Sequence, residues 1–216
     1  DRIRVVHNGV DPERFLSDEP APEPERPTVG FVARIDRIKD PLTLIRAAAT
    51  MRDELPDVHV RLWGETAAGQ DDYEAEVLAE IDRLQLHEVV SLEGRTNDVT
   101  GAFRACDVVV MCSISEGLPY SVLEAMMTGA AIVATDVGGI AEALDGVGVL
   151  VPPRNPDALA AATLQLLLNP KLRRDLAERA RARACSEFTL DRMVHAYASA
   201  YGSFLPVVDL RDHTSP

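Results

Sequence analysis

Two acidic side chains, Glu116 and Glu124, stand eight positions apart where a strand is predicted to lead into a helix. The apolar residues 107–112 predict a buried strand before them, and the helix is expected to end near residue 128. A helix in this position directs its first, unpaired N–H groups at the carboxyl edge of the sheet, where they attract anions. Because ionised carboxylates accept hydrogen bonds from hydroxyls, the segment predicts a ligand with both phosphates and sugar hydroxyls, such as a nucleotide sugar.

The residues between the two glutamates suit the same chemistry. Gly117 would let a phosphate approach the backbone closely, and the fixed φ of Pro119 suits a first helical turn. Each acid also has a simpler explanation. Ser121 and Glu124 have the spacing of a capping box, in which Glu124 would serve only its own helix, and Glu116 could be a solvated loop charge. The residue pattern leaves these alternatives open.

Two cations, Arg34 and Lys39, follow a further buried strand that is predicted at residues 28–34. Asp40 and Pro41 would then cap and start a helix that runs to about residue 55. On such a loop the cations could clamp a diphosphate, Arg34 with its fork of donors and Lys39 as a point charge. Ordinary surface charge is the alternative.

The chain alternates strand and helix about six times, which predicts an α/β fold with a doubly wound, Rossmann-like parallel sheet of about six strands and helices on both faces. The other strands are expected at residues 58–64, 89–92, 130–135 and 148–151. Ligands of such sheets bind beyond the carboxyl ends of the strands, where Gly94, Arg95 and Thr96 would join the cations and acids. A competing role for Thr96 or Asn97 is to cap a short helix at residues 99–105.

Several other segments carry structural predictions. Residues 2–6 predict a short strand, and residues 189–204 predict a final helix. Asn155-Pro156 and Asn169-Pro170 each predict a capped helix start, and the basic residues of the second of these helices are expected on a solvated face. Trp63 is expected to pack rather than to stack on a base.

The motifs resemble family 4 of the retaining glycosyltransferases. The resemblance is carried by Ser115-Glu116-Gly117-Leu118-Pro119, Glu124-Ala125-Met126, Gly129 and residues 133–139. It implies the C-terminal half of a GT-B fold. Residues 1–27 would be an interdomain junction with an acidic, proline-rich loop, residues 28–186 the donor-binding domain, and residues 187–216 a crossing helix with a frayed tail. One departure is Ala33, where the family has glycine.

The resemblance also implies roles for individual residues. Glu116 would hold sugar hydroxyls near the reacting carbon, Glu124 would hold the ribose, and Arg34 and Lys39 would stabilise the leaving diphosphate. The remaining donor-binding residues would be Gly94, Arg95, Thr96, Gly117, Leu118, Pro119, Tyr120 and Ser121. Residues 114–119 and 38–40 look like the branch that builds Pel-type exopolysaccharide from UDP-glucose.

Composition limits the class of protein. The 216 residues carry a formal net charge of −13, which argues against nucleic acid and against an anionic membrane as general partners. The three cysteines have no metal-ligand spacing, and buried free thiols in a reducing compartment are expected. The resemblance implies a cytoplasmic protein, with the inner face of the membrane as a second location for its parent.

The sequence holds neither G-x-G-x-x-G nor G-x-x-x-x-G-K-[ST]. It also lacks Asp-x-Asp, so donor binding without a protein-bound metal and without a cofactor is expected. The partners would be a nucleotide diphosphate sugar and the N-terminal acceptor domain of a longer chain, and this fragment alone would not catalyse transfer. Two alternatives are a GT-B-fold nucleotide-sugar epimerase and a non-catalytic module that binds nucleotide sugars or regulates.

Overall fold

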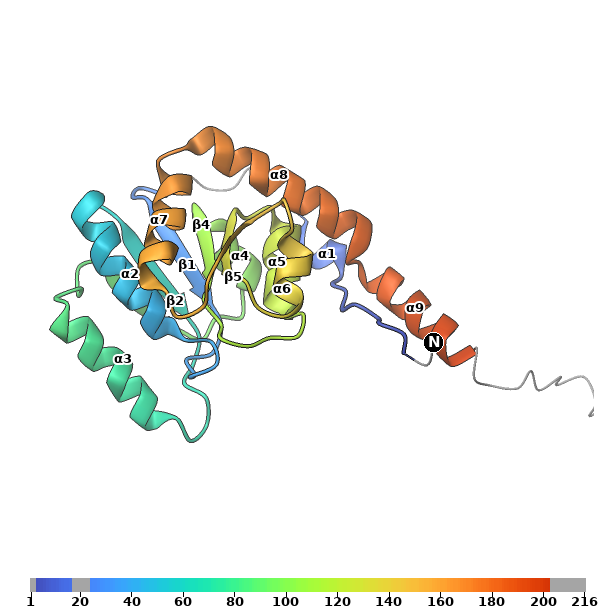
Figure 1. Cartoon of the computed structure of the whole chain (residues 1–216), viewed down its shortest axis with the longest axis horizontal. Coiled ribbons are helices and arrows are strands. Elements are labelled where there is room, and N and C mark those ends of the chain that lie inside the picture. Colours follow the sequence, from blue (N-terminus) through green and yellow to red (C-terminus); the bar gives the residue numbers. More distant parts are fainter. Residues whose placement is uncertain (1–2, 17–23, 203–216) are drawn as a thin grey trace, which may run out of the picture.

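A computed structural model of the chain describes residues 3–16 and 24–202. Its centre is a parallel sheet of six strands in the order β3-β2-β1-β4-β5-β6, so the predicted doubly wound sheet is confirmed (Figure 1). The strands are β1 (Thr28–Val32), β2 (His59–Trp63), β3 (Val90–Gly94), β4 (Val108–Met111), β5 (Ile132–Thr135) and β6 (Val149–Val151).

The central strands are apolar on both faces because helices cover both sides of the sheet. All four residues of β4 and all four of β5 are buried. Alternate side chains enter two separate cores, with Val108 and Val110 in one and Val109 and Met111 in the other, as the period of two in a strand requires. Trp63 is 8% exposed, and the guanidinium of Arg61 lies 4.5 Å from its ring centroid.

The helices form two outer layers on either side of the sheet, with α2 and α3 to its left and α5 and α6 to its right in Figure 1. The first core packs under α2 (Pro41–Glu54), α3 (Asp71–Arg83) and α7 (Pro156–Leu167). The second packs under α1 (Pro12–Phe15), α4 (Val99–Arg104), α5 (Tyr120–Thr128) and α6 (Gly139–Leu144). The long helix α8 (Pro170–Glu187) contributes to both cores and leads into α9 (Leu190–Gly202).

The predicted helix starts at Asn155 and Asn169 are confirmed, since each asparagine oxygen accepts a backbone N–H of the first turn. The predicted cap at Asp40 is wrong in its geometry. Asp40 adopts the left-handed region with φ 48°, and its carboxylate accepts the hydroxyl of Thr43 instead of a backbone N–H. The cap of α4 is Asp98, not Thr96 or Asn97.

Three other predictions need correction. Residues 3–6 form no strand; a single bridge follows later in the chain, between Val10 and Thr189. Gly94 is not in a loop but ends β3, with φ 69°. The arginines of α8 are not simply solvated, because Arg173 pairs with Asp107 at 2.9 Å and others bind loop carbonyls.

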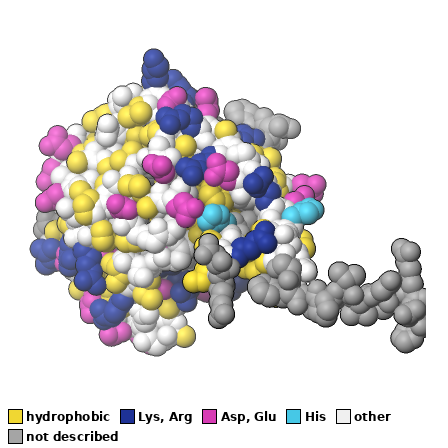
Figure 2. Space-filling view, turned by 45° about the vertical axis from the view of Figure 1, so that its right-hand side comes forward, with side chains coloured by type: hydrophobic (Ala, Val, Ile, Leu, Met, Phe, Trp, Pro, Cys, Tyr) yellow, Lys and Arg dark blue, Asp and Glu magenta, His cyan; other side chains and the backbone are white. Residues whose placement is uncertain are grey.

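The predictions for the cysteines are confirmed only in part. Cys112 is buried and Cys106 partly buried, but Cys185 is exposed, against the expectation of buried thiols. Most of the predicted acidic, proline-rich loop and the predicted frayed tail lie outside the described residues, which omit 17–23 and 203–216. Among the residues that the structure describes, no helix has the length and apolarity needed to cross a bilayer. Acidic and basic side chains are interspersed on the face shown in Figure 2.

The carboxyl edge of the sheet is braced by a glycine pair. Gly138 has φ 50°, and a Cβ added there would lie 1.8 Å from the carbonyl oxygen of Glu116. The N–H of Gly139 donates to the carbonyl of Gly117 at 2.6 Å. The pair thus presses the loop after β5 against the loop after β4, a contact that only glycine permits.

We expect Gly138→Ala to lower the free energy of unfolding by roughly 2–4 kcal/mol, because the backbone clash adds to the cost of a positive φ. Urea denaturation measures this loss. Gly69→Ala is the matched control, since Gly69 has φ 77° with no atom within 4 Å of an added Cβ, and we expect a loss of about 1 kcal/mol. Equal losses in the two variants would contradict the close contact.

Candidate functional site

The predicted cation Lys39 and the predicted acid Glu116 meet at the carboxyl edge. Parallel pairing of β1 with β4 brings the loops after these two strands together, and the ammonium of Lys39 donates to Oε1 of Glu116. Their side chains are 17% and 14% exposed, so the ion pair is largely removed from water. Because an ammonium has three donors, Lys39 keeps hydrogen-bonding capacity for a further anion.

Two residues that sequence reasoning missed fix the position of Glu116. The hydroxyl of Ser113 donates to the same Oε1 at 2.8 Å, and the hydroxyl of Thr135 donates to the carbonyl of Ser113 at 2.6 Å. Ser113 and Thr135 are both buried. Since both donors use Oε1, the second oxygen of the carboxylate stays available for a ligand hydroxyl.

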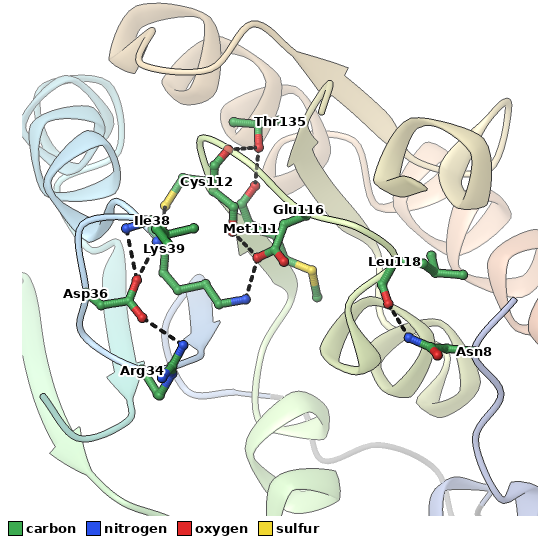
Figure 3. A network of polar contacts seen from close by, with 11 residues as sticks. Asn8, Arg34, Asp36, Ile38, Lys39, Met111, Cys112, Glu116, Leu118 and Thr135 are labelled. Carbon is green, nitrogen blue, oxygen red and sulfur yellow. Dashed lines mark hydrogen bonds and ion pairs between the residues drawn. The ribbon is translucent and has the colours of Figure 1, made fainter. Parts of the chain in front are cut away.

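A third missed residue, Asp36, organises the cation loop. Its Oδ1 accepts the backbone N–H groups of Ile38 at 3.0 Å and Lys39 at 2.8 Å. Its Oδ2 lies 3.1 Å from an amino group of Arg34. Figure 3 shows Arg34, Asp36 and Lys39 along one loop, with Glu116 facing them from the loop after β4.

Arg34 lines a cavity of about 430 Å³, which shares Val32 and Ala33 with the space around Lys39 and Glu116. Three other predicted site residues, Arg95, Thr96 and Glu124, line the same cavity. The structure therefore brings together residues from four loops and helices that are far apart in sequence. The cavity is also lined by residues that sequence reasoning did not assign: Val32, Trp63, Gly64, Glu65, Thr66, Ala67, Ala68 and Val99.

Glu124 is half-buried on α5, and burial raises the pKa of its carboxyl above the ordinary value. The capping-box alternative is wrong, because the N-cap of α5 is Pro119 and no side chain caps this helix. No hydrogen bond or ion pair to Glu124 forms within residues 3–16 and 24–202. Its carboxylate is thus free of a role in its own helix.

The loop that follows Glu116 and the first turn of α5 lie next to the ion pair between Lys39 and Glu116. Pro119 and Ser121 line a narrow space together with Lys39 and Glu116, and the first turn of α5 carries no side-chain cap. Gly117 and Tyr120 are exposed. Of the predicted residues, Gly94, Gly117, Leu118 and Tyr120 line neither the cavity nor this space.

The loop is also tied to the start of the chain. The amide of Asn8 donates to the carbonyl of Leu118 at 2.7 Å across 110 positions. In the sequence Asn8 precedes Gly9, a pair that indicates a local turn and no distant partner. Ser113 and Asp36 lie within three residues of the predicted Glu116 and Lys39, and that proximity was their only signal.

Within the described residues, a reactive thiol or a metal site would depend on the cysteine and metal-ligand side chains. Burial raises the pKa of the Cys112 thiol, and its S–H points at the carbonyls of Lys39 and Asp40 at 3.3 and 3.1 Å, so it is an internal donor. Among residues 3–16 and 24–202, no three His, Cys, Asp or Glu side chains cluster as metal ligands. The metal-free donor site stays a prediction.

Known proteins resemble the chain along most of its length. A D-inositol 3-phosphate glycosyltransferase of Corynebacterium urealyticum is 35% identical over 219 residues, covering 92% of this chain and 51% of that protein. A corresponding enzyme of Mycobacterium ulcerans is 34% identical over 94% of this chain and 46% of its own length. The chain thus spans about half the length of these relatives.

Solved structures share the fold. HepE of Anabaena in complex with UDP-glucose has a TM-score of 0.85 and 25% identity, covering 93% of this chain and 57% of that one. The C-terminal domain of LpcC from Francisella tularensis, a group 1 family protein, has a TM-score of 0.76 and 26% identity, covering 84% of this chain and all of that one. This domain therefore has the Rossmann-like architecture of GT-B glycosyltransferases.

The family model of glycosyl transferases group 1 matches residues 13–183. The match includes both cations, both glutamates and every strand of the sheet. The chain belongs to the group 1 glycosyltransferases.

Proposed function

We propose that this chain is the donor-binding half of a retaining, family 4 glycosyltransferase that transfers a hexose from a nucleotide diphosphate sugar. Residues 28–186 bind the donor, residues 1–27 form the junction to an acceptor domain, and residues 187–216 cross back to that domain. The observation that carries the proposal is the meeting of Lys39 and Glu116 beside the cavity that Arg34 and Glu124 line.

The charges are arranged as a pyrophosphate-linked sugar requires. Arg34 and Lys39 lie on one loop, where they meet the diphosphate and the negative charge that develops on it as the sugar leaves. The free oxygen of Glu116 accepts a sugar hydroxyl near the reacting carbon, and Glu124 accepts the ribose hydroxyls from the neighbouring cavity. The first N–H groups of α5 supply further donors to the phosphates.

UDP-glucose is the proposed donor. The support is that HepE, which is similar to 93% of this chain, was solved in complex with UDP-glucose, together with the resemblance to the exopolysaccharide branch. A calorimetric titration with UDP-, GDP- and ADP-glucose tests this choice. Preference for a purine diphosphate sugar would contradict it.

Helix α9 of this chain offers an apolar surface on which the proposed acceptor domain could pack. Helix α9 buries none of its residues and exposes Val194, Tyr197 and Tyr201, which recur at helical spacing. Because such a face is costly in water, we propose that the acceptor domain covers it and that this chain alone binds donor without transferring sugar. Turnover by the isolated chain would contradict this division.

We expect Lys39→Ala to weaken UDP binding about tenfold or more, because a charge-assisted hydrogen bond to phosphate contributes roughly 1.5–3 kcal/mol. Isothermal calorimetry with UDP measures the loss. Arg37→Ala is the matched control, since Arg37 is two residues away but pairs with Asp72 and Glu76 on α3. Equal losses in both variants would show a general charge effect and not a phosphate contact.

We expect Glu116→Ala to affect the sugar and not the nucleotide. The variant frees Lys39 for the diphosphate, so UDP affinity should be unchanged or higher. The advantage of UDP-glucose over UDP should disappear, because the acceptor of the sugar hydroxyl is lost. Paired titrations with the two ligands check this, and a preserved advantage for UDP-glucose would remove Glu116 from the sugar site.

We expect Glu124→Gln to stabilise the protein and weaken its ligand binding. A carboxyl whose pKa is raised on folding costs stability as pH rises from its ordinary value of 4.5 through the raised value. The variant should therefore melt about 1–3 °C higher at pH 7, with the difference vanishing below pH 4.5. Thermal melts from pH 4 to 8 check the first effect, and titration with uridine checks the second.

Glu65→Gln is the control for this prediction. Glu65 lines the same cavity but is exposed, so its neutralisation should leave the melting temperature unchanged. A similar rise in both variants would mean that net charge, and not the burial of Glu124, sets the effect.

A further inference from the structure

We infer that Asp36 is a positioning residue that presets both phosphate-binding cations, Arg34 and Lys39. The inference rests on the proposed function and extends it to a residue that does not touch the ligand. Asp36 is 2% exposed, and its two oxygens have separate partners. Oδ1 holds the backbone of Lys39, and Oδ2 holds the guanidinium of Arg34 (Figure 3).

The contact with Arg34 matters because this side chain is otherwise unrestrained. The Arg34 side chain is 67% exposed, and a long exposed arginine loses considerable rotamer freedom when a ligand orders it. Anchoring one amino group on a buried carboxylate removes part of that loss in advance. The remaining N–H donors of the guanidinium stay available at the cavity that Arg34 lines.

The contact of Asp36 with the loop fixes the backbone position of Lys39. Oδ1 accepts two consecutive N–H groups, those of Ile38 and Lys39, and the N–H of Asp40 donates back to the carbonyl of Asp36 at 3.1 Å. This turn fixes the backbone from which the Lys39 side chain reaches Glu116. A single buried carboxylate therefore sets the separation of the two cations.

An opposite expectation follows from charge alone. A carboxylate close to a diphosphate repels it, so neutralising Asp36 would strengthen ligand binding if repulsion dominated. The carboxylate is already compensated by a guanidinium and two N–H groups, which leaves little net repulsion for the ligand to feel. Loss of preorganisation should therefore outweigh the gain, and the sign of the change distinguishes the two mechanisms.

The experiment compares UDP with uridine in Asp36→Asn by calorimetry. Asparagine keeps an oxygen for the loop N–H groups but presents an N–H donor to Arg34. UDP should bind about tenfold more weakly, and uridine should bind within twofold of the wild type, because only UDP reaches the cations. Asp36→Ala removes both anchors and should weaken UDP binding further, with uridine again unchanged.

Asp72→Asn is the matched control, since Asp72 also pairs with an arginine, Arg37 at 2.9 Å, but stands exposed on α3. This variant should change the affinity for neither UDP nor uridine. Unchanged or tighter UDP binding in Asp36→Asn, or equal weakening of UDP and uridine, would overturn the inference. A wild-type chain that binds neither ligand would instead overturn the proposed function.

A double-variant cycle keeps the inference testable if Asp36→Ala does not fold. In an Arg34→Ala background, Asp36→Asn should change UDP affinity less than twofold, because the anchored group is absent. A full tenfold effect in that background would mean that Asp36 does not act through Arg34.

Discussion

The ion pair between Lys39 and Glu116 is the contact on which the carboxyl edge of the sheet depends. The two residues are 77 positions apart, and only the parallel pairing of β1 with β4 brings their loops together. Each charge is mostly removed from water, so either one would be costly without the other. The strand order is therefore the condition that allows these charges to be buried. The point between β1 and β4 is the topological switch point, where the order in which strands are added to the sheet reverses.

A chain with a net charge of −13 can still present a site for an anion. At physiological salt, charges are screened beyond about 8 Å, so the local arrangement and not the total decides what a ligand meets. Lys39 shares Oε1 of Glu116 with Ser113, which keeps the acid and the cation in fixed positions.

Sequence predicted the parts of this molecule that local chemistry determines. Apolar runs located the strands, Asn155 and Asn169 located two helix starts, and the rule for parallel sheets brought Lys39 and Glu116 to one edge. It failed where a contact depends on tertiary geometry. The spacing of a capping box was present, but the N-cap of α5 is Pro119, two residues before Ser121, so Ser121 lies inside the helix and does not cap it. Asp36 looked like any loop aspartate until its burial was known.

The acids of this edge differ in how their burial is compensated, and that difference separates structural roles from ligand-binding ones. Asp36 receives a guanidinium and two N–H groups, and Glu116 receives an ammonium and a hydroxyl on one oxygen. Glu124 receives no donor from the described part of the chain, and burial raises its pKa. A half-buried carboxylate whose main nearby charge is that of Arg14 costs some stability on folding. This state agrees with the role proposed for Glu124, in which its carboxylate accepts the ribose hydroxyls of the donor.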